Sequence, residues 1–214
     1  MPIMKYNYIL WDWNGTLLDD LDASVCAVND MLEAYGKEPL DLKTYYSYID
    51  TPIYKFYERI FDLNVVTMEV IKPLFGELYI KHEDKMQLAP DADRVLEYCK
   101  AQGVKQYILS AAHIDDLMRY AVPFGVADYF EKIEAAKDYE AGSKIDRARL
   151  LLAQEKIAPD ECVMIGDTLH DLDTSEALGV DCILYSKGHT DYNVLKKTGR
   201  PVCRSFDEIL EILK

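Results

Sequence analysis

Short runs of apolar, β-branched and aromatic residues recur along the chain between stretches with helical spacing. The runs are YNYILW (6–11), VKQYIL (104–109), FEKIEA (130–135), CVMI (162–165) and CILY (182–185). Near-continuous apolar strands that alternate with helices are typical of a parallel sheet covered by helices on both faces. The pattern therefore predicts an α/β fold with a doubly wound parallel sheet.

More than eighty residues without a strand pattern separate the first predicted strand from the second. Apolar residues recur there at helical intervals, as at Val28, Met31, Leu32 and Tyr35. So much helix exceeds what one crossover between parallel strands needs. We predict an inserted all-helical cap over residues 17–86, and an α/β core made of residues 1–16 and 87–214.

The first predicted strand ends at Asp12, in the string WDWNGTLLD (11–19). An Asn-Gly pair between apolar residues is a strong hairpin signal, so a β-hairpin is one interpretation. The residues after Leu18 turn acidic and then helical, with no partner strand. That pattern favours a carboxylate presented at the edge of the sheet, with Gly15 allowing a tight turn beside it. Ligands of open parallel sheets bind at the carboxyl ends of the strands.

Ser110 ends the second predicted strand and is followed by Ala111. A serine there is often the N-cap of the next helix, and the free N–H groups of a helix N-terminus also bind anions. Lys144 stands at a helix start that Ser143 and Asp146 mark as a capping box. A solvated surface lysine is the ordinary interpretation of Lys144. Its position before a core helix favours a cation that holds an anionic group.

The fourth predicted strand runs into the string GDTLHD (166–171). Two carboxylates four residues apart, Asp167 and Asp171, can meet on one side of a turn and hold a hard cation through oxygen ligands. An N-cap beside a solvated aspartate is the alternative. His170 lies between them, but Mg²⁺ prefers oxygen ligands. The loop GHT (188–190) after the fifth strand lies near the expected site, and a surface histidine is its ordinary interpretation.

The chain is acidic: Lys and Arg total 24 against 38 Asp and Glu, for a formal net charge of −14 in 214 residues. Such a surface repels phosphate backbones and anionic lipid, which predicts no nucleic-acid and no membrane partner. Five scattered cysteines without a Cys-x-x-Cys pair predict reduced thiols. No signal peptide or membrane-span pattern appears, so we predict a cytoplasmic protein. The pattern carries no prediction of oligomeric state.

These features together resemble the haloacid dehalogenase superfamily, most of whose members are phosphohydrolases. The resemblance covers nearly the whole chain, and it includes the Rossmann-like sheet and the helical cap of the phosphoglycolate phosphatase-like branch. It rests on four motifs in the family's order: Asp12, Asn14 and Thr16; Ser110; Lys144; and Gly166, Asp167 and Asp171.

The resemblance implies a Mg²⁺-dependent phosphohydrolase that acts on a small phosphorylated metabolite, with phosphoglycolate suggested by the branch alone. In such enzymes the aspartate that matches Asp12 attacks phosphorus and forms an aspartyl phosphate. The implied metal ligands are Asp12, the backbone carbonyl of Asn14, and Asp167. Asp171 supports the metal site or orients Lys144.

Four residues are implied as substrate contacts. They are Thr16, Ser110, Ala111 and Lys144, which hold the transferring phosphoryl group in this scheme. Asp12, Asn14 and Lys144 form the implied catalytic set.

Asn14 departs from the family pattern, which has an aspartate that protonates the leaving group and then activates water. A carboxamide cannot take up or release a proton at neutral pH. General acid–base help contributes about 10²–10⁴ in rate, so we expect activity to survive best on acyl and aryl phosphates. Asp19 and Asp20 lie nearby in sequence as substitute bases.

Two alternative functions stay open. The string DWNGT (12–16) also resembles phosphonoacetaldehyde hydrolases, which cleave a carbon–phosphorus bond with a cap lysine as Schiff base. Lys55 is the candidate here, and a solvated helix lysine is its ordinary interpretation. The other alternative is a non-catalytic protein that binds a phosphometabolite, because Asn14 replaces the acid/base residue.

Overall fold

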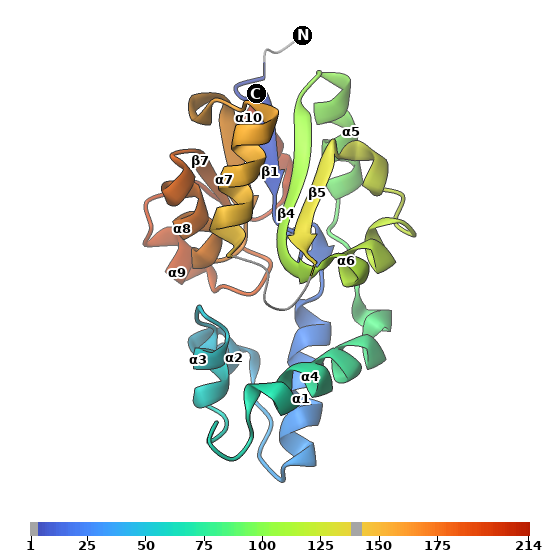
Figure 1. Ribbon diagram of the computed structural model, residues 1–214, viewed down its shortest axis with the longest axis vertical. Helices are drawn as coiled ribbons and strands as arrows, with labels where there is room; N and C mark the ends of the chain where they lie inside the picture. Colours follow the sequence, from blue (N-terminus) through green and yellow to red (C-terminus); the bar gives the residue numbers. More distant parts are fainter. Residues whose placement is uncertain (1–3, 138–142) are drawn as a thin grey trace. The chain divides into compact units, whose positions relative to one another are not determined.

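The computed structural model describes residues 4–137 and 143–214 (Figure 1). The chain divides into two compact units: Met1–Leu18 with Leu88–Lys214, and Asp19–Gln87. Residues 1–3 and 138–142, which the sequence assigns to the core, lie outside the described residues. We call the two units the α/β unit and the helical unit.

A six-stranded sheet, in the order β5-β4-β1-β6-β7-β8, forms the centre of the α/β unit (Figure 1). All of its strand pairs are parallel, so the predicted doubly wound fold class is confirmed. The strands are β1 (Tyr8–Trp11), β4 (Lys105–His113), β5 (Lys132–Ala136), β6 (Cys162–Gly166), β7 (Asp181–Tyr185) and β8 (Val202–Cys203). The sequence did not predict β8, because two residues are too few to show a period.

Helices cover both faces of this sheet, as predicted. They are α5 (Ala92–Ala101), α6 (Ile114–Ala121), α7 (Lys144–Glu155), α8 (Leu169–Leu178), α9 (Tyr192–Lys196) and α10 (Phe206–Leu213). On one face, Leu10 and Met164 of the central strands pack with Leu151 of α7. On the other face, the Trp11 ring stacks on Phe206 of α10, with ring centroids 5.8 Å apart. Alternate residues of β1 therefore anchor opposite helical layers.

Side chains fix where the helices begin. The Ser143 hydroxyl accepts a hydrogen bond from the Asp146 N–H at the start of α7, and Ser205 accepts one from Glu208 at the start of α10. The predicted helix start at Ser143 is confirmed. The N-cap interpretation of Ser110 is wrong, because β4 continues to His113 and the His113 side chain caps α6.

The helical unit contains α1 (Leu21–Ala34), α2 (Leu42–Tyr48), α3 (Tyr54–Glu58) and α4 (Met68–Lys81). Its core joins residues from all four helices, among them Met31, Tyr45, Phe56 and Ile71. The Tyr79 hydroxyl of α4 donates to Asp20, just before α1, at 2.6 Å. Two strands of two residues each, β2 (Leu18–Asp19) and β3 (Gln87–Leu88), pair at the ends of this segment. The prediction of an all-helical cap missed these two strands, because two residues are too few to show a period.

None of the helices within the described residues is long and apolar enough to span a membrane.

Candidate active site

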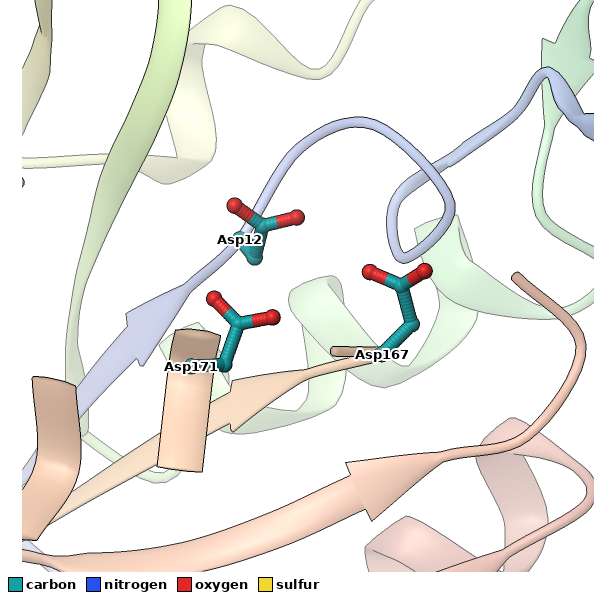
Figure 2. A group of neighbouring side chains, drawn as sticks. All are labelled: Asp12, Asp167 and Asp171. Atoms are coloured by element: carbon teal, nitrogen blue, oxygen red, sulfur yellow. The ribbon is translucent and has the colours of Figure 1, made fainter. Parts of the chain in front are cut away.

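Three aspartates meet where β1 and β6 end. Asp12 directly follows β1, and its N–H donates to the Ile165 carbonyl of neighbouring β6 at 2.8 Å. Asp167 directly follows β6, and Asp171 lies in the first turn of α8 (Figure 2). Oxygens from the three carboxylates lie within 4.8 Å of one another. Neighbouring parallel strands end at the same edge of a sheet, which is why residues so distant in sequence meet here.

Lys144 lies within hydrogen-bond distance of two of these carboxylates. Its Nζ donates to Asp12 Oδ1, and to Asp171 Oδ1 at 2.6 Å. Lys144 is the first residue of α7 and is only 4% exposed, so the interpretation as a solvated surface lysine is wrong. A buried ammonium that touches two buried carboxylates forms strong, charge-assisted hydrogen bonds.

Asp171 uses both of its carboxylate oxygens inside the protein. Oδ2 accepts from the Thr168 N–H at 3.0 Å and from the Thr168 hydroxyl at 2.7 Å. Thr168 and Asp171 thus form a reciprocal capping box at the start of α8. Oδ1 accepts from Lys144. The alternative of a solvated aspartate is wrong, and the geometry favours the orientation of Lys144 as the role of Asp171.

Asp167 is held by groups on two separate segments. Its Oδ1 accepts from the Thr16 hydroxyl at 3.1 Å, and its Oδ2 accepts from the His189 N–H at 2.6 Å. A Cβ atom at Gly188, or at Gly15 with its φ of 73°, would overlap Asp167 Oδ2. These glycines let two loops approach one carboxylate closely. The Thr16 hydroxyl thus orients Asp167, and its role as a substrate contact stays a prediction.

The turn after β1 carries Asn14. The Gly15 N–H donates to the Leu18 carbonyl, and the Leu18 N–H donates to the Trp13 carbonyl, both at 2.9 Å. The strand that follows this turn, β2, pairs with β3 and not with β1. The hairpin interpretation is therefore wrong. Asn14 is half-buried within this turn.

Ser110 and Ala111 lie inside β4, three and two residues before its end. The Ser110 hydroxyl is buried and accepts from the Ala112 N–H at 3.0 Å. Ala111 is exposed. Their role as phosphoryl contacts stays a prediction, and it does not rest on a helix N-terminus at Ser110.

Arg147 is a residue that the sequence analysis did not single out. One of its guanidinium nitrogens donates to the Ser110 carbonyl at 2.9 Å, which ties α7 to β4. Arg147 lies three residues after Lys144, so helical spacing puts both cations on one side of α7. That spacing is the sequence signal that could have found it.

The site carries more negative than positive charge. Burial, with Asp171 and Asp167 nearby, raises the pKa of Asp12 to about 8, although the Lys144 charge opposes this shift. Burial opposes the ammonium form of Lys144, but Asp12 and Asp171 outweigh it and raise the pKa of Lys144. Burial also opposes ionisation of Asp171, and Lys144 still lowers the pKa of Asp171. When ionised, three carboxylates beside one ammonium leave two negative charges uncompensated.

An all-oxygen donor set with this excess charge fits a hard divalent cation such as Mg²⁺. The second oxygen of Asp12 accepts no hydrogen bond from the described residues, so it is available as a ligand or a nucleophile. Asp167 faces the same cluster from the end of β6 (Figure 2). The residues present therefore fit a magnesium site built on Asp12 and Asp167.

The chain is similar to several known proteins. The family model for haloacid dehalogenase-like hydrolases matches residues 9–185. A phosphoglycolate phosphatase from Psychrobacter arcticus is 27% identical over 198 residues, which cover 87% of this chain and 86% of that protein. The tyrosine-protein kinase PtkA from Mycobacterium tuberculosis is 26% identical over 212 residues, which cover 96% of this chain and 72% of the kinase.

Among solved structures, a haloacid dehalogenase-like family hydrolase from Streptococcus pneumoniae superposes with a TM-score of 0.84. It is 19% identical and covers 98% of this chain and 99% of its own, which shows a shared fold. The resemblance predicted from the four motifs is confirmed by the family model. The prediction of an enzyme of the phosphatase class is supported by the family and by the phosphoglycolate phosphatase relatives.

Proposed function

We propose, from the premise that the chain belongs to the haloacid dehalogenase-like hydrolase family, that it is a Mg²⁺-dependent phosphohydrolase of small phosphorylated metabolites. The single observation that carries the proposal is the buried Lys144, whose ammonium group bonds both Asp12 and Asp171. A phosphatase relative covering most of the chain supports the phosphoryl group as the target.

Asp12 is the nucleophile in this proposal. Its carboxylate attacks phosphorus and forms an aspartyl phosphate, which divides one difficult displacement into two steps. Lys144 bonds one oxygen of Asp12 and leaves the other available. Its charge also favours the ionised carboxylate that the attack requires.

Asp171 and Thr168 act as positioning residues. Asp171 fixes the Lys144 ammonium, and the capping box with Thr168 fixes Asp171 to the start of α8. A change at Thr168 therefore reaches the phosphoryl group only through two intervening side chains.

Mg²⁺ is the cofactor in this proposal, with Asp12, Asp167 and the backbone carbonyl of Asn14 as its protein ligands. Thr16 and the His189 N–H hold Asp167 in place for this role. When bound, the ion offsets the charge of the phosphoryl oxygens, so that an anionic carboxylate can approach them.

Asn14 sets the expected substrate preference. It cannot protonate a leaving group, so a substrate whose leaving group is already a stable anion is favoured. Acyl and aryl phosphates meet this condition, and alkyl phosphates do not. Equal rates on acyl and alkyl phosphates would contradict this preference.

The test is phosphate release from acetyl phosphate, p-nitrophenyl phosphate and phosphoglycolate, with Mg²⁺ and with a chelator. The Asp12→Asn variant is the control, because it keeps the shape of the side chain and removes the nucleophile. We expect metal-dependent release that this variant loses, with phosphoglycolate the slowest of the three. Release that persists in Asp12→Asn would refute the assignment of the nucleophile.

The phosphonoacetaldehyde hydrolase-like alternative depends on Lys55. The surroundings of Lys55 do not favour a Schiff base. The Lys55 side chain is 42% exposed, donates to the Thr51 carbonyl at 2.9 Å and lies 3.8 Å from Asp50. A Schiff-base lysine is desolvated in an apolar pocket, whereas the Lys55 side chain is exposed beside a carboxylate. Borohydride with phosphonoacetaldehyde is expected to leave no adduct on Lys55.

The third alternative, a binding protein without turnover, predicts a different result. Such a protein binds Mg²⁺ and a phosphate mimic but releases phosphate from none of the three substrates. The same assay therefore separates it from the proposed phosphohydrolase.

A further inference from the structure

The two steps of the proposed reaction make different demands on proton transfer. In the first, an oxygen of Asp12 attacks phosphorus, the bond from phosphorus to the leaving oxygen breaks, and its electron pair leaves on that oxygen. An acyl or aryl leaving group departs as a stable anion, so this step moves no proton. Asn14 does not slow it.

The second step does need a base. Water attacks phosphorus, the bond between phosphorus and Asp12 breaks, and its electron pair returns to the Asp12 carboxylate. The attacking water must lose a proton on the way to phosphate. Asn14, two residues beyond Asp12 in the turn after β1, cannot accept that proton.

The other carboxylates of the cluster are held in place as hydrogen-bond acceptors. Asp171 accepts from Lys144 with one oxygen and from Thr168 with the other. Asp167 accepts from Thr16 with one oxygen and from the His189 N–H with the other. Protonation of either carboxylate would weaken these bonds, so neither replaces the missing base without loss.

We propose, on the basis of the phosphohydrolase function above, that the aspartyl phosphate of Asp12 accumulates during turnover of acyl and aryl phosphates. It then transfers its phosphoryl group to a carboxylate acceptor in competition with water. The activity is a phosphotransfer between carboxylates, and the chain carries the phosphoryl group between the two half-reactions.

A carboxylate acceptor suits this site because it needs no base. One of its oxygens attacks phosphorus, the bond between phosphorus and Asp12 breaks, and the electron pair returns to Asp12. The products are a new acyl phosphate and the free Asp12 carboxylate, and no proton moves. Hydrolysis does need a base. Without one, it is slower by the factor of about 10²–10⁴ that a general base contributes.

The first measurement is rapid-quench kinetics with p-nitrophenyl phosphate in Mg²⁺ buffer. We expect a burst of p-nitrophenolate of about one equivalent per chain, followed by slower steady turnover. Mass spectrometry of the acid-quenched chain is expected to find one added phosphoryl group, on the peptide that contains Asp12. Hydroxylamine treatment of that quenched chain removes an acyl-linked phosphoryl group and confirms its linkage.

The second measurement is exchange. The protein is incubated with acetyl phosphate and propionate, and the acyl phosphates are then converted to hydroxamates and separated. We expect propionyl hydroxamate to form in proportion to the protein added. The Asp12→Asn variant is expected to give none.

The third measurement restores the base. Asn14→Asp is nearly the same size as the natural residue, and we expect it to remove the burst and raise steady hydrolysis about 10²-fold or more. Asn193→Asp is the matched control, because it adds the same charge at an exposed position in the first turn of α9. That control is expected to keep the burst of the unaltered chain.

The outcomes separate this inference from the function on which it rests. Asp12-dependent phosphate release with no burst, no labelled chain and no exchange would overturn the accumulation and keep the phosphohydrolase. It would mean that another group, such as the His189 imidazole beside Gly15, supplies the base. A His189→Gln variant that then gains a burst would identify that group. Neither release nor labelling with any substrate would overturn the proposed function itself.

Discussion

A lysine that bonds carboxylates is buried in the α/β unit and exposed in the helical unit. In the α/β unit, Lys144 is buried against two buried carboxylates. In the helical unit, the Lys81 ammonium bonds Asp30 at 2.7 Å, but the Lys81 side chain is 63% exposed. Both lysines bond carboxylates, but Lys144 is buried and bonds two of them, whereas Lys81 is exposed.

Burial changes the pKa values of the groups in such a contact. Two unit charges interact several-fold more strongly near or below a protein surface than in bulk water. Burial also removes the solvation of a charged group, and this raises the pKa of Asp12 to about 8 against the opposing pull of Lys144. The pKa of half-buried Asp30 is lowered, mainly by its hydrogen bond to Lys81. We infer that the buried carboxylates around Lys144 serve the reaction, whereas the partly exposed Lys81–Asp30 pair takes no part in it.

The largest contrast is expected from the carboxylates themselves. Asp12→Asn removes the nucleophile and should lower kcat on acetyl phosphate by about 10⁴-fold or more. Asp30→Asn weakens the contacts of Asp30 with Lys81 and His82, far from any catalytic residue in sequence, and should keep most of the activity. Steady-state phosphate release from both variants tests this, with circular dichroism to show that each is folded. A large loss in Asp30→Asn would contradict the division of roles.

Substitution of Lys144 and of Lys81 should have different effects on the stability of the α/β unit. Lys144→Met leaves Asp12 and Asp171 buried without a cation and should lower the free energy of unfolding by about 3–5 kcal/mol in chelator. Trp11 and Trp13 are both buried in the α/β unit, so tryptophan fluorescence during urea unfolding reports that unit. Lys81→Met, at an exposed site, is expected to leave this transition unchanged. Equal effects of the two variants would refute the comparison.

Glycine substitutions test close packing at the site. The Cβ of Gly188→Ala would overlap Asp167 Oδ2 and the Gly15 carbonyl, so we expect a loss of about 1–3 kcal/mol and weaker Mg²⁺ dependence. Gly76 lies inside α4 with no atom within 4 Å of the added Cβ. Gly76→Ala should therefore stabilise the helical unit by about 0.5–1 kcal/mol. Thermal unfolding followed by far-ultraviolet circular dichroism measures both.

The last expected effect is in the pH dependence of the metal-free protein. The folded pKa of Asp12, about 8, exceeds its usual value of 3.8, so the unfolded chain releases this proton first. Stability should fall as pH rises between these values, and Asp12→Asn should remove that contribution. The lowered pKa of Asp171 acts in the opposite sense, but only below its usual value of 3.8, so the two contributions fall in different pH ranges.

The helical unit should show the opposite sign. The pKa of Asp30 is lowered by Lys81, so its contribution is complete above its usual pKa and is lost as pH falls through the lowered value. Urea midpoints of the natural chain, Asp12→Asn and Asp30→Asn across pH 3–9 in chelator test both signs. A rising contribution of Asp12 with pH would contradict the buried-carboxylate account.

The sequence predicted the parallel sheet and the residues at its ends because these signals are local. An apolar run is buried wherever it lies, and Asp12 and Asp167 each follow such a run directly. Family membership likewise followed from the order of motifs along the chain. Strands of two residues escaped prediction because they are too short to carry a period.

The tertiary structure decided how these residues share their contacts. Lys144 and Asp12 are 132 residues apart, so no spacing along the chain encodes the bond between them. The sequence analysis did not identify the capping box of Thr168 with Asp171. It could not show that this box occupies one Asp171 oxygen and leaves the other to Lys144. The crowding of Gly188 against Asp167 arises only when two separate loops converge. Residue type and local order are written in the sequence, whereas distance and burial between remote side chains exist only after the sheet has brought its strand ends together.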